Sequence, residues 1–249
     1  MWINHFLPGW SEARDFIFLK LFPGRFKYRN VRRFVIDADR EVLLVGTIHQ
    51  AHLTTPEYGL ADVGNLVINY LPDRIGIEAR PEDLARGLLM MAPVEMAQTA
   101  LLARRRNISV FGFDSWREQE YEAAAERGES PDFNDDARND SMFELMREGF
   151  QSGRRILLLT GYSHLPPLAG RLRRVGRESP LSSEAKKALF SSRGGSGQLN
   201  PKLLPSLELT IEHLEQYVSR HPGENAWSRR VRRKLERLRE LRRRLVERD

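Results

Sequence analysis

Two short apolar segments, each ending in a glycine that is followed three residues later by a histidine, contain the residues best suited to chemistry. Residues 42–47 lead to His49, and residues 156–161 lead to His164. An aliphatic run without polar alternation is typical of a strand covered on both faces of a parallel sheet. Ligands of open α/β sheets bind beyond the carboxyl ends of the strands. The two imidazoles are therefore predicted to meet at one edge of a sheet.

Carboxylates follow two further predicted strands. Residues 74–78 end on Glu78, and residues 109–114 end on Asp114. Parallel strands deliver these side chains to the same edge, whatever the strand order. His49, His164 and Glu78 then suit a divalent metal (Mn, Co or Zn) that acidifies a bound water. In a metal-free form, one histidine is the general base for a water molecule that Glu78 orients.

An Arg-Asn pair lies in the first turns of the helix predicted from residue 134 or 135 to residue 152. This helix precedes the second histidine strand and runs antiparallel to it, so its beginning lies at the same edge. Asn139 shares a helical face with Met142, Met146 and Phe150, which should face the sheet. Asn139 and Arg138 are therefore expected to point inward, and Arg138 could stabilise an oxyanion in the metal-free form.

The remaining pattern predicts an α/β fold with a parallel-dominated central sheet and helices on both faces. A hairpin is expected from strands 33–38 and 41–47, which a tight turn joins. Helices are expected at 57–71, at 81–106 with a break or kink at Pro93, at 116–126 and at 167–174. Strands and helices that alternate in this way pair in parallel through right-handed crossovers.

The predicted chain organisation has four parts. Residues 1–32 form an N-terminal segment with an aromatic helix at 11–22, closed by Pro23 and Gly24. Residues 33–177 form the α/β catalytic-like domain. Residues 178–200 are rich in serine and glycine and are expected to be a flexible linker or lid. Residues 201–249 form a pair of helices.

The last helix combines an apolar seam with a row of basic residues. The seam has coiled-coil spacing, which suggests a homodimer through the C-terminal helices; it consists of Trp227, Val231, Leu235, Leu238, Leu241 and Leu245. Residues 226–249 hold eleven Arg and Lys against four Asp and Glu, so the net charge of +6 belongs to this tail. The row is either a solvated helix face or a site for nucleic acid or an acidic partner.

The composition of the chain excludes some kinds of site and predicts its cellular compartment. The chain has no cysteine, so disulfides and thiolate metal sites are excluded. Its N-terminus lacks the basic start and continuous apolar run of a signal peptide, and no stretch approaches the ~20 apolar residues of a membrane span. The sequence therefore predicts a cytoplasmic protein.

The ordered motifs over residues 41–168 resemble those of the TraB/GumN/Tiki group, within the wider superfamily that includes erythromycin-esterase-like and ChaN-like proteins. The shared elements are Gly46-Thr47-Ile48-His49, Glu78, Arg138-Asn139 and Gly161-Tyr162-Ser163-His164. The resemblance implies a hydrolase of a peptide or ester substrate, either a metal-dependent peptidase or a metal-free esterase. A ChaN-like haem protein is the non-enzymatic alternative. In it, Tyr162 would bind the iron instead of packing.

Overall fold

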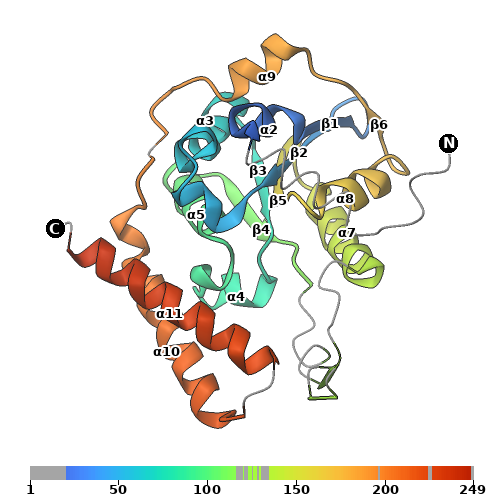
Figure 1. Ribbon diagram of the computed structural model, residues 1–249. Helices are drawn as coiled ribbons and strands as arrows, with labels where there is room; N and C mark the ends of the chain where they lie inside the picture. Colours follow the sequence, from blue (N-terminus) through green and yellow to red (C-terminus); the bar gives the residue numbers. More distant parts are fainter. Residues whose placement is uncertain are drawn as a thin grey trace.

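The computed structural model describes residues 21–115, 120, 123–124, 126–127, 129, 135–195, 197–223 and 226–247. A six-stranded sheet of order β4-β3-β5-β2-β1-β6 lies at its centre (Figure 1). Its strands are β1 (Val31–Val35), β2 (Glu41–Thr47), β3 (Arg74–Ile77), β4 (Ser109–Gly112), β5 (Arg155–Gly161) and β6 (Arg177–Glu178). β2, β5, β3 and β4 are parallel neighbours, and β1 is antiparallel to β2. The predicted α/β class and parallel-dominated sheet are confirmed.

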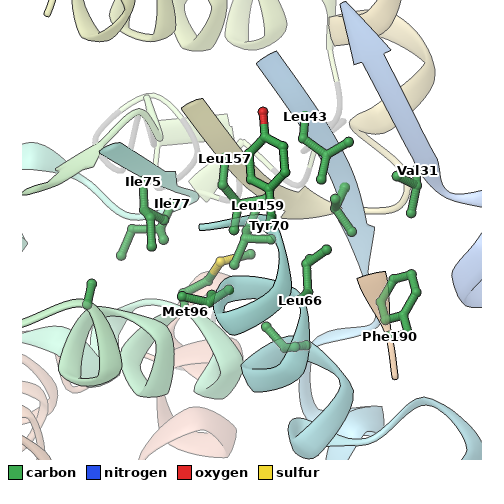
Figure 2. Packing of buried hydrophobic residues seen from close by; sticks show 14 of the residues in the cluster. Val31, Leu43, Leu66, Tyr70, Ile75, Ile77, Met96, Leu157, Leu159 and Phe190 are labelled. Carbon is green, nitrogen blue, oxygen red and sulfur yellow. The ribbon is translucent and has the colours of Figure 1, made fainter. Parts of the chain in front are cut away.

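The apolar runs of β2 and β5 are buried on both faces. Leu43 and Leu157 point into one hydrophobic cluster, which Figure 2 shows, while Val42 and Ile156 point into the cluster on the opposite face. Successive side chains of a strand point to opposite faces, so a strand without polar alternation needs cover on both. The sheet therefore lies between two helical layers.

The first layer consists of α2 (Pro23–Arg29), α3 (Leu60–Tyr70) and α5 (Val94–Arg105) (Figure 1). Two 3-10 turns, η1 (His49–Leu53) and η2 (Pro56–Tyr58), precede α3, so this helix starts later than predicted. The helix expected at 81–106 is interrupted earlier than Pro93: α4 (Pro81–Ala85) ends at Ala85, Gly87 has a φ of 74°, and the turn η3 (Leu89–Met91) follows. Pro93 is the N-cap residue at which α5 begins.

The second layer consists of α7 (Asp136–Phe150) and α8 (Leu165–Leu172). Asp135 caps α7 through its side chain, which accepts a hydrogen bond from the backbone N of Arg138. Met142, Met146 and Phe150 are buried against the sheet, as the helical spacing predicted. The first turn of α7 therefore lies at the carboxyl edge of the parallel strands.

Three expectations need correction. Pro23 begins a helix, α2, because its fixed φ suits a first helical position. The first strand starts at Val31, inside the predicted N-terminal segment. The segment 178–200, predicted as a linker or lid, contains helix α9 (Ser183–Leu189), and the Phe190 ring packs edge-on against Tyr28 and Tyr58. Part of it therefore belongs to the first helical layer. The predicted helices 11–22 and 116–126 fall largely outside the described residues.

The C-terminal helices α10 (Leu204–Arg220) and α11 (Ala226–Val246) follow the turn η4 (Pro201–Leu203) and pack on each other and on η3 and α5. The predicted seam of α11 packs in this cluster within one chain, with Leu241 partly buried and the other seam residues buried. A homodimer through these helices stays a prediction. Arg239 and Arg242 pair with Glu215 and Glu208 of α10. Within the described ranges, no helix is long and apolar enough to cross a membrane.

Candidate active site

His49 lies in a tight turn at the end of β2. Its backbone φ is 52°, in the left-handed region that histidine tolerates better than most residues. His52 holds this turn: its Nε2 accepts a hydrogen bond from the backbone N of Ile48 (3.1 Å), and its Nδ1 donates to the carbonyl of Tyr58 (2.7 Å). Both ring nitrogens of His52 are therefore occupied, and burial lowers its pKa. Its role is to position His49.

Glu78 follows β3 and joins it to the end of β5. Its Oε2 accepts hydrogen bonds from the backbone N of Gly161 (2.5 Å) and the hydroxyl of Thr160 (2.8 Å). Burial would raise the pKa of Glu78, but its electrostatic interactions with His164, His49 and Arg138 outweigh this effect and lower the pKa. Glu78 is therefore an anion in the centre of the site.

His164 lies just before α8, and its tautomer follows from its contact with Asn139. Asn139 Nδ2 donates to the carbonyl of Asp135 (2.9 Å), so its Oδ1 faces the imidazole. The Nδ1–H of His164 donates to this oxygen (2.9 Å). The opposite nitrogen, Nε2, lies 3.9 Å from Glu78 Oε1. Asn139, predicted to point inward, is thus the residue that orients His164.

Arg138 lies between two carboxylates. Its Nη2 donates to Asp114 Oδ1 at 2.7 Å and lies 3.7 Å from Glu78 Oε1. Burial raises the pKa of Asp114, while the charge of Arg138 opposes this rise. Arg138 was predicted to face a developing oxyanion. Its observed contacts make it the cation that neutralises Glu78 and Asp114, and Asp114 holds it in place.

Because Gly161 has no side chain, His49 can approach Glu78 over the end of β5. A Cβ atom at position 161 would lie 2.5 Å from His49 Nε2 and 3.5 Å from Glu78 Oε2. Both functional atoms therefore lie on the same side of Gly161, over the end of β5. Interactions with His49 and with His164 both lower the pKa of Glu78. The two glycine-histidine motifs thus converge on one carboxylate, as their positions at the ends of neighbouring strands predicted.

Glu95 is a site residue that sequence reasoning missed. It lies in the first turn of α5, is fully buried, and its Oε1 is 3.0 Å from His49 Nδ1 and 2.6 Å from the hydroxyl of Thr47. Burial would raise its pKa, but the hydrogen bond and charge of His49 prevail and lower it to about 2. The sequence did contain a signal for it: Glu95 is a carboxylate among the apolar residues Val94, Met96 and Ala97, a pattern otherwise typical of a buried helix face.

Several donors of the predicted metal and haem sites have protein partners. Among the residues that the structure describes, no three His, Cys, Asp or Glu side chains are grouped to hold a metal ion. Glu78 Oε2 is engaged by Thr160 and Gly161, and Arg138 stands beside Oε1, where a second cation would be repelled. The ring of Tyr162 packs edge-on against Phe26, with centroids 5.5 Å apart. This contact corresponds to the packing role that was the alternative to iron binding.

No protein-family model matches the chain, and comparisons with curated proteins and with solved structures gave no match either. The TraB/GumN/Tiki-like resemblance therefore stays a prediction that rests on the motifs.

Proposed function

We propose that the protein is a hydrolase of the TraB/GumN/Tiki-like kind, which cleaves a peptide or ester bond with a water molecule activated at His49, Glu78 and His164. The observation that carries this proposal is the convergence of two imidazoles on one buried carboxylate at the carboxyl edge of a parallel sheet. Such an edge is where open α/β sheets bind their ligands, and buried groups with shifted pKa values are concentrated at functional sites.

The chemistry uses an imidazole as general base. It takes a proton from water as the water oxygen attacks the carbonyl carbon, a contribution of about 10²–10⁴-fold in rate. The anionic Glu78 stabilises the positive charge that forms on the base. Arg138 and Asp114 keep this carboxylate ionised and in place. Asn139 keeps His164 in one orientation.

Removal of divalent metal separates this route from the predicted metal-dependent one. Hydrolysis is expected to continue at an unchanged rate after dialysis against a chelator, because Arg138 Nη2 lies 3.7 Å from Glu78 Oε1 and its charge opposes a second cation at that oxygen. Elemental analysis of the purified protein should accompany the assay. Activity that disappears with the metal and returns on adding Mn, Co or Zn would establish the metal route instead.

The proposed function is tested with a panel of peptide and ester substrates. The wild-type protein is expected to hydrolyse at least one member, and His49→Ala and His164→Ala are each expected to lose that activity while circular dichroism shows an intact fold. His221→Ala is the matched control, since this exposed histidine stacks on Tyr217 at the end of α10. Folded His49→Ala or His164→Ala protein with wild-type rates would refute the proposal.

A further inference from the structure

We propose that Glu95 is a positioning residue that holds His49 as an imidazolium with Nε2–H turned toward the strand ends, which makes His49 the oxyanion donor and leaves His164 as the base. This assignment rests on the proposed hydrolase function and divides the work between its two histidines. It also gives a role to a buried carboxylate that the motifs do not include.

The surroundings of Glu95 require a cation. The residue is 0% exposed, and its Oε2 has no hydrogen-bond partner among the described residues. Its Oε1 meets two groups, the neutral hydroxyl of Thr47 and Nδ1 of His49. An ionised carboxylate without water needs a paired positive charge. Within the described part of the chain, the His49 ring is the group in contact that can carry it.

The other charges around His49 also favour its protonated form on balance. Burial lowers its pKa, as does the charge of Arg138 from α7. Glu95 from α5 and Glu78 after β3 raise it more strongly, and the resulting pKa of His49 is about 9. His52 of the same turn adds no charge, since both its nitrogens are engaged as a neutral ring. The Glu95–His49 pair is thus an ion pair at neutral pH.

The exposure and orientation of the two histidines fit different tasks. The His49 side chain is 35% exposed and Nε2, the ring nitrogen opposite the Glu95 contact, lies over Gly161, whereas the His164 side chain is 5% exposed. A substrate carbonyl oxygen therefore meets the Nε2–H donor of His49 first. On His164, Nδ1–H is bound to Asn139, so the lone pair of Nε2 is the one that can accept a proton.

Water gives a proton to His164 Nε2 while its oxygen bonds to the carbonyl carbon. The carbonyl π electrons move to the oxygen, which accepts a hydrogen bond from His49 Nε2–H. When the bond to the leaving group breaks, that group takes the proton from His164. His49 keeps its own proton throughout and acts as a fixed donor, the kind of group that typically contributes 10²–10³-fold.

Glu95→Gln tests this assignment, because it keeps the size of the side chain and removes its charge. In nitrogen-15 NMR spectra at neutral pH, the wild-type His49 ring is expected to be protonated on both nitrogens and the Glu95→Gln ring on one. On a substrate from the panel, kcat is expected to fall about 10²-fold or more with little change in KM. Glu95→Asp keeps the charge and should retain part of both properties.

Glu184→Gln, on the exposed face of α9, is the matched control and should change neither measurement. A wild-type His49 ring that is neutral at neutral pH overturns the assignment, as does a Glu95→Gln protein with wild-type kcat. The spectra need no substrate. They decide the state of His49 even if no member of the panel is hydrolysed, so failure of this inference is distinguishable from failure of the proposed function.

Discussion

Arg138→Leu is expected to lower the free energy of unfolding by about 3–5 kcal/mol, because it leaves two buried carboxylates without their shared cation. Arg138 is 5% exposed in its side chain and contacts both Asp114 and Glu78. Removing one partner of a buried charge pair costs far more than removing an exposed one, since water does not reach the charges that remain. Urea unfolding at neutral pH measures the loss.

Arg147→Leu is the matched control on the same helix. Its side chain is 57% exposed and lies 3.6 Å from Glu144, so a change within about 0.5 kcal/mol is expected. The deficit of Arg138→Leu should also shrink in acid. Without Arg138 the folded-state pKa of both carboxyls rises, so the instability is full above these raised pKa values and fades as pH falls through them toward the ordinary values of 4.5 and 3.8. Equal losses in the two variants would contradict the arrangement.

Gly161→Ala is expected to reduce hydrolysis about 10²-fold or more while the protein stays folded. The added methyl group would lie 2.5 Å from His49 Nε2 and 2.9 Å from its Cε1, so the ring must move away from the site. A displacement of about 1 Å is enough for a loss of this size. Because His49 is partly exposed, its ring can turn toward solvent, at the cost of its bond to Glu95. Steady-state kinetics and thermal unfolding measure the two effects.

Gly170→Ala provides the same chemical change without the contact. A Cβ atom at Gly170 meets nothing within 4 Å, and the residue lies inside α8, where alanine is the better helix former. This variant should keep wild-type activity and gain about 0.5–1 kcal/mol of stability. Wild-type hydrolysis by Gly161→Ala would show that His49 does not act from the position described, and would remove one of the two imidazoles from the proposed reaction.

Sequence reasoning located most of the site because the periodicity of buried strands and helices is local information. The apolar runs that end at Thr47 and Gly161 predicted parallel strands, and their ends predicted where His49, Glu78, Asp114 and His164 lie. The spacing of Met142, Met146 and Phe150 likewise predicted the inward face of α7, and with it the position of Asn139. In each case the side-chain period of an element determines the direction of its functional residue.

Other features depended on packing between distant segments, where no local pattern exists. Glu95 becomes the partner of His49 because the apolar residues of α5 pack in the core and bring this helix into contact with η1. The period of a helix alone does not predict which of its turns contacts which loop. The same holds for Arg138, which the tertiary structure places between Glu78 and Asp114. The sequence alone therefore determined which residues reach the edge of the sheet. Only the tertiary structure decided their pairings, because contact distances and charge partners arise when separate elements pack together.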